Sequence, residues 1–110
     1  MYFAAPKADS PVTAVLVGIE GELLGKLYAL TNGENKLGRA ETCEIVLMSP
    51  TISREHANIV HQDGVFAIIP LSDKNRTYLN DEVVEGCELS DGDKLRMGRT
   101  TFRFRTIEGP

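Results

Sequence analysis

The fold is decided by the stretch ANIVHQDGVFAIIP, which covers residues 57–70. Two largely apolar runs flank the pair Asp63-Gly64, and such a pair is typical of the two-residue turn that joins antiparallel strands. No window of about twelve residues in the chain shows the apolar stripe of an amphipathic helix. The stretch therefore predicts a β-hairpin with strands over residues 57–61 and 65–70.

Short runs of the same kind occur on both sides of this hairpin. Each is bounded by Gly, Asn, Asp, Ser or Pro, which favour turns. In the last run Phe102 and Phe104 alternate with Arg103 and Arg105, a pattern typical of a strand with one buried face. Together the runs predict an antiparallel β-sandwich or barrel of about ten or eleven strands. The further predicted strands cover residues 12–19, 23–24, 27–30, 35–37, 44–47, 77–79, 83–84, 94–97 and 101–107.

The composition fits one globular domain of 110 residues, with 42% apolar and 25% charged residues. No stretch approaches the ~20 apolar residues that a membrane-spanning helix needs, so we expect no membrane association. The net charge of −4 disfavours a general role in nucleic-acid binding. Residues 1–11 have no basic start and contain Pro6, so we expect a flexible N-terminal tail rather than a secretory signal, followed by a folded domain over residues 12–107.

Cysteine and histidine are too sparse for a metal centre. Cys43 and Cys87 lie far apart and form no paired motif, so we expect reduced thiols in a cytoplasmic protein. His61 has no second His or Cys at a ligand spacing. The sequence thus predicts neither a metal nor another cofactor.

Four polar segments lie between the predicted strands, in loops of the kind that commonly carry binding residues. A phosphate monoester has a charge of about −1.5 to −2 and three acceptor oxygens. A guanidinium fork, hydroxyls and free backbone N–H groups suit such a group. Arg39 can supply the fork, Ser53 a hydroxyl and Arg54 a backbone N–H. The four segments are Gly38-Arg39, Ser53-Arg54-Glu55-His56, Lys74-Asn75-Arg76-Thr77 and Asn80.

The order and spacing of these segments resemble the forkhead-associated (FHA) domain, over about residues 14–106. The resemblance implies an FHA-like antiparallel β-sandwich of about eleven strands with its binding loops at one end. It also implies a module that binds phosphothreonine peptides and is not an enzyme. The partner would be a phosphothreonine-containing protein in Ser/Thr-kinase signalling, and we expect the module to be a monomer.

The same resemblance implies a role for each polar segment. Arg39 and Ser53 would hold the phosphate, and Asn75 would clamp the peptide backbone beside it. The ring of His56 would hold the loop that carries Ser53. The residues expected to bind the phosphopeptide are Arg39, Ser53, Arg54, Lys74, Asn75 and Arg76, and those expected to support the site are Gly38, His56 and Asn80.

Three positions depart from the FHA pattern. Arg76 stands where the family usually has glycine, which tolerates a positive φ. Either Arg76 adopts that conformation at a cost of roughly 1 kcal/mol, or the turn has relaxed and its side chain points toward the ligand. Lys74 stands where a hydroxyl residue is common, and it can act as a point charge instead. Asp73 stands where serine is usual, and it either pairs with Lys74 or Arg76 or weakens phosphate binding.

Two other binding functions remain open beside the phosphothreonine-binding module. The first is an FHA-fold interaction module whose degenerate site binds partners independently of phosphate. The second is nucleic-acid binding through Arg96, Arg103 and Arg105, although no aromatic side chain is interleaved with them on that exposed face. We expect these three arginines to form a solvated face and not to bind nucleic acid.

Two further interpretations concern single residues of the polar segments. A hydrolase triad can be drawn from Ser53, His56 and either Asp63 or Asp73, but the sequence has no nucleophile elbow and no glycine-rich oxyanion segment. Arg39 can alternatively be a surface residue paired with Glu41 or Glu44. We therefore expect no triad, and the FHA resemblance favours Arg39 as a phosphate ligand over the ion-paired surface residue.

Overall fold

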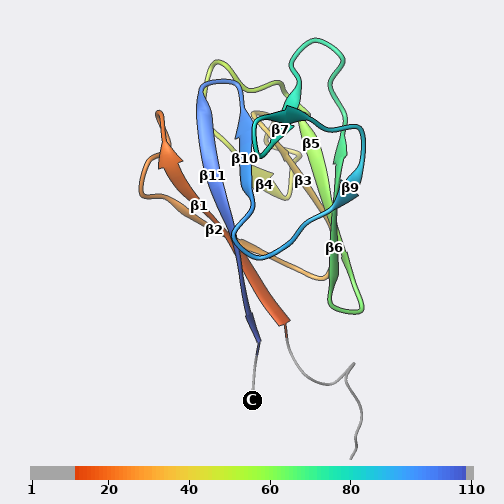
Figure 1. Ribbon diagram of the computed structural model, residues 1–110. Coiled ribbons are helices and arrows are strands. Elements are labelled where there is room, and N and C mark those ends of the chain that lie inside the picture. The colour runs from red at the N-terminus through yellow and green to blue at the C-terminus, as the bar shows by residue number, and fades with distance from the viewer. Residues whose placement is uncertain (1–11, 109–110) are drawn as a thin grey trace, which may run out of the picture.

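The computed structural model describes residues 12–108 as two β-sheets packed face to face (Figure 1). The predicted all-β sandwich of about eleven strands is confirmed. The tail predicted over residues 1–11 lies outside the described residues. The strands are β1 (Val12–Glu20), β2 (Leu27–Leu30), β3 (Gly33–Gly38), β4 (Ile45–Val46), β5 (Ala57–Gln62), β6 (Val65–Pro70), β7 (Thr77–Leu79), β8 (Glu82–Val83), β9 (Cys87–Glu88), β10 (Lys94–Met97) and β11 (Thr100–Glu108). One sheet has the order β2-β1-β11-β10-β7-β8, and the other has the order β4-β3-β5-β6-β9.

The hairpin predicted from residues 57–70 forms as β5 and β6. Gln62 pairs with Val65 across a two-residue turn. The turn residues Asp63 and Gly64 have φ angles of 54° and 80°. Positive φ at both positions gives the turn a twist that matches the right-handed twist of the flanking strands. Local sequence chemistry is therefore sufficient to specify this hairpin.

The sheets differ from the sequence-based prediction at three places. β4 runs parallel to β3 and pairs Ile45 with Leu37, whereas an antiparallel arrangement was expected. β9 was not predicted, since its two residues are exposed and show no alternation of apolar and polar side chains. Residues 23–24 form a turn instead of a strand.

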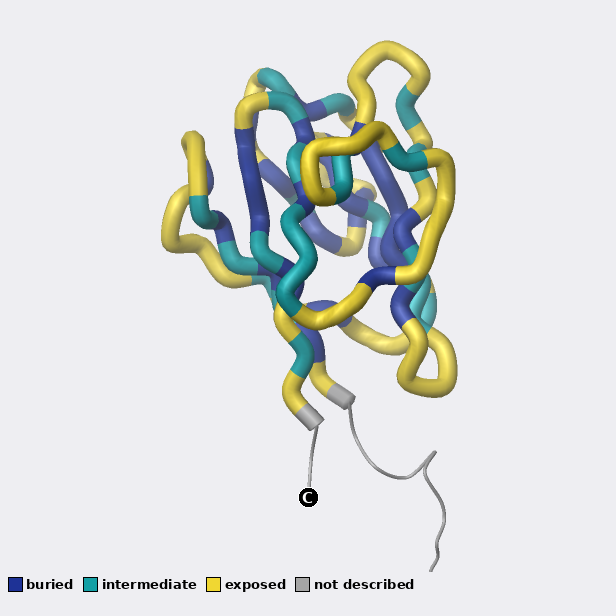
Figure 2. The backbone as a smooth tube through the Cα atoms, in the orientation of Figure 1, coloured by how far each residue is buried: buried dark blue, intermediate teal, exposed yellow. Residues whose placement is uncertain are grey.

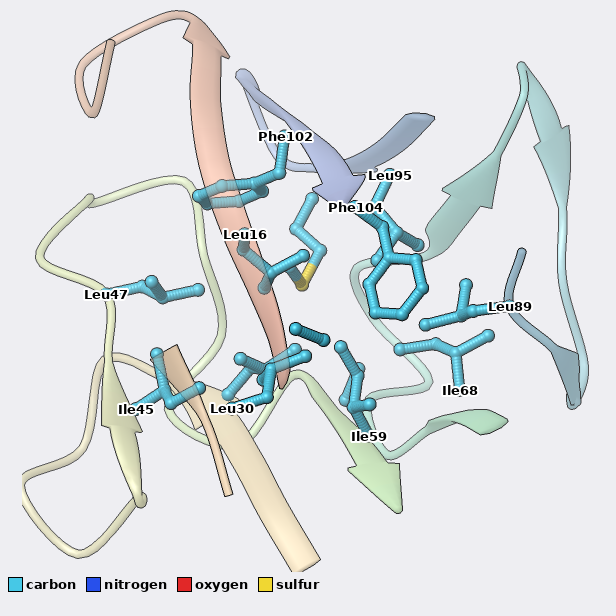
Figure 3. Close-up of a cluster of buried hydrophobic side chains, with 14 of the residues drawn as sticks. Leu16, Leu30, Ile45, Leu47, Ile59, Ile68, Leu89, Leu95, Phe102 and Phe104 are labelled. Atoms are coloured by element: carbon cyan, nitrogen blue, oxygen red, sulfur yellow. The ribbon is translucent and has the colours of Figure 1, made fainter. Parts of the chain in front are cut away.

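Apolar side chains from both sheets fill the space between them (Figure 3). The alternation predicted for the last strand is confirmed, because Phe102 and Phe104 are fully buried whereas Arg105 is exposed. Phe104 packs edge-on against Phe66 of the opposite sheet, with ring centres 5.2 Å apart. The core also contains Leu37 and so anchors the end of β3, from which the first polar loop starts.

The loops that carry Ser53 and Asn75 lie at one end of the sandwich. In Figure 1 the β4–β5 and β6–β7 loops are at the top, whereas β1 starts and β11 ends at the bottom. Most residues of the β6–β7 loop are exposed (Figure 2). Within residues 12–108 there is no helix long and apolar enough to cross a membrane.

Candidate functional site

The first two polar loops are joined by hydrogen bonds along their backbones. The N–H of Arg39 donates to the carbonyl oxygen of Ser53 at 3.0 Å, and the N–H of Ala40 donates to that of Arg54 at 3.1 Å. The thiol of Cys43, which is buried and free, also donates to the Arg54 carbonyl at 3.3 Å. A Cβ atom at Gly38 would lie 2.1 Å from that same oxygen. Glycine at position 38 therefore allows the close approach that sets Arg39 beside Ser53.

His56 connects these loops to the third one. Its ring is fully buried, and its Nδ1 atom accepts the backbone N–H of Ser53 at 3.1 Å. Because Nδ1 accepts a hydrogen bond, the ring proton is on Nε2, which donates to the carbonyl oxygen of Arg76 at 3.1 Å. Burial lowers the pKa of His56 below its usual 6.5, and the bond to Arg76 opposes this shift. The buried imidazole thus stays neutral and holds two loops together.

Ser53 lies in a polar cluster with Ser72 and Asn75. The hydroxyls of the two serines are 2.9 Å apart. The side-chain amide of Asn75 donates to Ser53 Oγ at 2.7 Å, and its backbone N–H donates to Ser72 Oγ at 3.1 Å. Asn75 therefore bridges both hydroxyls at the surface.

Ser72 was missed by the sequence analysis. Asp73 stands two residues before Asn75, where the FHA pattern usually has serine, whereas the hydroxyl in the cluster comes from Ser72, one residue earlier. The carbonyl oxygen of His56 accepts N–H groups from Leu71 and Ser72 and so sets where this loop starts. The only signal in the sequence was a serine in the same loop, one position from the expected place.

Arg39 is exposed, and its side chain is held by the neighbouring β4–β5 loop. Its Nε atom donates to the carbonyl oxygen of Ile52 at 2.8 Å, next to Ser53. Within residues 12–108 it forms no ion pair with Glu41 or Glu44. With Nε anchored, the two terminal nitrogens of the guanidinium remain available for an anion.

Three more exposed cations occupy the same loops, namely Arg54, Lys74 and Arg76. In the part of the chain that the structure describes, positive φ outside glycine occurs at Asp63, Asn80 and Asp81, so the turn at Arg76 has relaxed and avoids the strain. Asp73 forms no ion pair with Lys74 or Arg76 in the same part of the chain. The electrostatic potential around these loops is therefore set by exposed cations and by the exposed Asp73 carboxylate, none of which forms an ion pair within residues 12–108.

Asn80 lies apart from the cluster, in the turn between β7 and β8. It has a φ of 50°, which asparagine tolerates better than most residues. Its Oδ1 atom accepts the N–H of Lys94 at 3.0 Å, and its Nδ2 atom donates to Asp93 at 3.1 Å. These bonds tie the β7–β8 turn to the start of β10.

The arrangement gives no support to a hydrolase triad. His56 contacts the backbone of Ser53 and not its hydroxyl, and the buried ring has no access to solvent. No described group of three His, Cys, Asp or Glu side chains could hold a metal ion. What the loops do offer is a set of hydrogen-bond donors and cations suited to an anionic ligand.

The C-terminal arginines are engaged within the fold. Arg103 donates to the carbonyl oxygen of Gly92 at 2.9 Å, and Arg105 forms a 3.0 Å ion pair with Asp91. The guanidinium of Arg96 lies 3.9 Å above the ring of Tyr78. This face is therefore less available to nucleic-acid phosphates than its sequence alone suggests.

Comparison with known proteins gives a consistent result. A sequence model of the FHA domain matches residues 35–98. The oxoglutarate dehydrogenase inhibitor of Corynebacterium diphtheriae is 35% identical over 112 residues, which cover 97% of this chain and 77% of that protein. The glycogen accumulation regulator GarA of Mycolicibacterium smegmatis is 32% identical over 98 residues, which cover 89% of this chain and 61% of GarA.

A solved structure extends this similarity to three dimensions. Mycobacterium tuberculosis EmbR in complex with a low-affinity phosphopeptide matches the chain with a TM-score of 0.76 and 30% sequence identity. The match covers 89% of this chain and 25% of that one. The similarity is therefore to one domain of a longer protein.

Proposed function

Because the chain belongs to the FHA domain family, whose members bind phosphothreonine peptides, we propose that Arg39, Ser53 and Asn75 bind a phosphothreonine-containing partner protein. The proposal rests on one observation above all. Three loops separated in sequence bring an anchored guanidinium, two hydroxyls and an amide to one exposed point. A phosphate with three acceptor oxygens can satisfy these donors together.

Each proposed role follows from the bonds already made in the free site. The guanidinium of Arg39 forms paired bonds to the phosphate through its terminal nitrogens, because its Nε atom is already used by Ile52. Ser53 turns its hydroxyl from its neighbours to a phosphate oxygen. Asn75 then exchanges its bond to Ser53 for one to the peptide backbone.

The other loop residues support this binding. Arg54 contributes its backbone N–H, while Lys74 and Arg76 add positive charge against a chain of net charge −4. Gly38 and His56 keep the loops at their separation, and Asn80 secures the neighbouring turn. The site thus works by fixed geometry more than by overall charge.

We further propose a monomeric binding module of Ser/Thr-kinase signalling, working in the cytoplasm and not acting as an enzyme. The relatives are described as an inhibitor and a regulator, which suits a binding role. Two free cysteines are ordinary in a reducing compartment. The chain spans about three fifths of the length of GarA. Our proposal therefore covers phosphopeptide binding by the matching region and not the activity of the whole of GarA.

Fluorescence anisotropy with phosphothreonine, phosphoserine and unphosphorylated versions of one peptide library tests the proposal. We expect selective binding of the phosphothreonine pool, weakened about 10- to 150-fold by Arg39→Ala, since a charge-assisted bond contributes ~1.5–3 kcal/mol. Arg105→Ala is the matched control, because it removes an arginine from the C-terminal face. Equal binding by wild type and Arg39→Ala would contradict the proposal.

A second function, phosphate-independent binding by the same fold, is favoured by one observation. The Asp73 carboxylate is exposed beside Ser72 and has no ion-pair partner within residues 12–108. A negative charge there opposes an incoming phosphate. If a captured partner is retained equally after phosphatase treatment, this second function replaces the first.

A further inference from the structure

A pocket of about 330 Å³ adjoins the proposed phosphate site. Ser72 belongs to both, because it lines the pocket and its hydroxyl bonds to Ser53. The pocket walls come from the β6–β7 loop with the strand residues at its two ends, and from the end of β8 with the segment that follows it. The lining residues are Pro70, Ser72, Asp73, Arg76, Thr77, Val83, Val84 and Glu85.

The lining combines an apolar surface with two carboxylates. Pro70, Val83 and Val84 supply the apolar part, and Val83 remains 41% exposed although it is a large apolar residue. Asp73 and Glu85 are exposed and form no ion pair in the described part of the chain. A side chain with an apolar stem and a cationic end matches both features.

Thr77 supplies an independent observation in the same pocket. It is 1% exposed, and its hydroxyl oxygen has no hydrogen-bond partner among residues 12–108. Buried hydroxyls are nearly always paired. Because this oxygen is itself buried, an ammonium or guanidinium group in the pocket supplies the missing partner only if the wall at Thr77 opens around it.

We propose that this pocket binds a lysine or arginine side chain of the phosphopeptide, close in sequence to the phosphothreonine. The inference rests on the proposed function of the neighbouring site. The aliphatic stem packs on Val83 and Val84, and the cationic end lies between Asp73 and Glu85. The pocket therefore selects among phosphothreonine peptides, and Asp73 acts as a selectivity residue and not as a defect of the phosphate site.

Arg76 also lines the pocket and is the one cation among its lining residues. Its carbonyl group is held by His56, so its side chain starts at the boundary between pocket and phosphate site. A bound phosphate attracts this guanidinium and leaves the two carboxylates to face the peptide side chain. An acidic peptide side chain would instead meet Asp73 and Glu85 and be repelled.

The test compares phosphothreonine peptides that carry Ala, Lys or Glu at single positions within about three residues on either side, a reach of ~10 Å of extended chain. We expect Lys to bind about 3- to 5-fold more tightly than Ala at one position, the size of a partly exposed ion pair. The double variant Asp73→Asn/Glu85→Gln should lose this preference and bind the Ala peptide at least as tightly. Glu55→Gln, an exposed carboxylate at the same end that does not line the pocket, should keep it.

Each alternative result separates the two proposals. Phosphate-dependent binding with no preference for Lys, with a preference for Glu, or with a preference that survives the double variant overturns the pocket assignment and leaves the phosphate site intact. Absence of any phosphate-dependent binding overturns both. Methyl NMR gives a second readout, because a Lys peptide should shift the signals of Val83 and Val84 more than the Ala peptide does, and equal shifts contradict the assignment.

Discussion

The hydroxyls of Ser53 and Ser72 lie 2.9 Å apart although the residues are 19 positions apart in the chain. Ser53 comes from the β4–β5 loop and Ser72 from the β6–β7 loop. Asn75 donates to both oxygens. The pair therefore joins the predicted phosphate ligand to a hydroxyl that the sequence-based prediction did not include.

Replacing Ser72 with alanine is expected to weaken phosphothreonine-peptide binding about 2- to 10-fold. The change removes the acceptor of the Asn75 N–H and the neighbour of the Ser53 hydroxyl, and one such bond contributes ~0.5–1.5 kcal/mol. Isothermal titration calorimetry measures the effect. Ser90→Ala is the control, since Ser90 is an exposed loop serine away from this cluster, and identical affinities of the two variants would argue against a role for Ser72.

Arg39→Lys is expected to lose most of the binding although it keeps the charge. The lysine side chain has a single nitrogen. It cannot donate to the Ile52 carbonyl as Nε of Arg39 does and also offer the phosphate a planar pair of donors. We expect affinity to fall by more than about tenfold, which corresponds to ~1.4 kcal/mol. The reverse exchange Lys74→Arg should change affinity far less, because Lys74 is an exposed residue for which a point charge is sufficient. Wild-type affinity in Arg39→Lys would mean that charge alone matters.

Because His56 is buried, we expect the free energy of unfolding to fall on acidification. Its pKa in the folded protein is lowered by burial below the usual 6.5, so the unfolded chain takes up a proton that the folded chain resists. The contribution of His56 to the free energy of unfolding is therefore fully present above about pH 6.5. It decreases as the pH falls from there toward the lowered pKa, by at most ~1.4 kcal/mol per pH unit.

Urea unfolding between about pH 7.5 and about pH 5.5 measures this slope. The slope should be lost in His56→Gln and kept in His61→Gln, whose ring stacks on Phe66 away from the loops. The ring NMR signals of His56 in the wild type give a second readout if His56→Gln does not fold. Ring signals that titrate at the ordinary histidine value would refute the prediction.

Gly38→Ala is expected to destabilise the protein by a steric clash. The added Cβ would lie 2.1 Å from the Arg54 carbonyl oxygen, which is backbone and can move only if the two loops separate. Gly33→Ala is the matched comparison, because Gly33 has a φ of 89° but open space around it, so it should cost only roughly 1 kcal/mol. Chemical unfolding should give a larger loss for Gly38→Ala, and an equal or smaller loss would show that the loops are not held as closely as described.

Much of the fold could be predicted because the deciding signals are local. Asp63-Gly64 specifies a tight turn through backbone conformations that these residues tolerate. The alternation of Phe102 and Phe104 with arginines specifies a half-buried strand. β9 was not predicted because it is an edge strand of only two residues, Cys87 and Glu88. It forms because β6 offers backbone groups that have no other partner strand on that side.

The β-sandwich and its polar loops with Arg39, Ser53 and Asn75 could be predicted from the amino-acid sequence, because turn chemistry and strand alternation act over a few residues. Tertiary structure alone decided that Ser72 provides the second hydroxyl, since buried His56 fixes the start of that loop through its carbonyl oxygen. It also decided that Asp73 and Glu85 share one pocket. Those relationships depend on how separate loops pack at one end of the sandwich, and no local stretch of sequence contains that information.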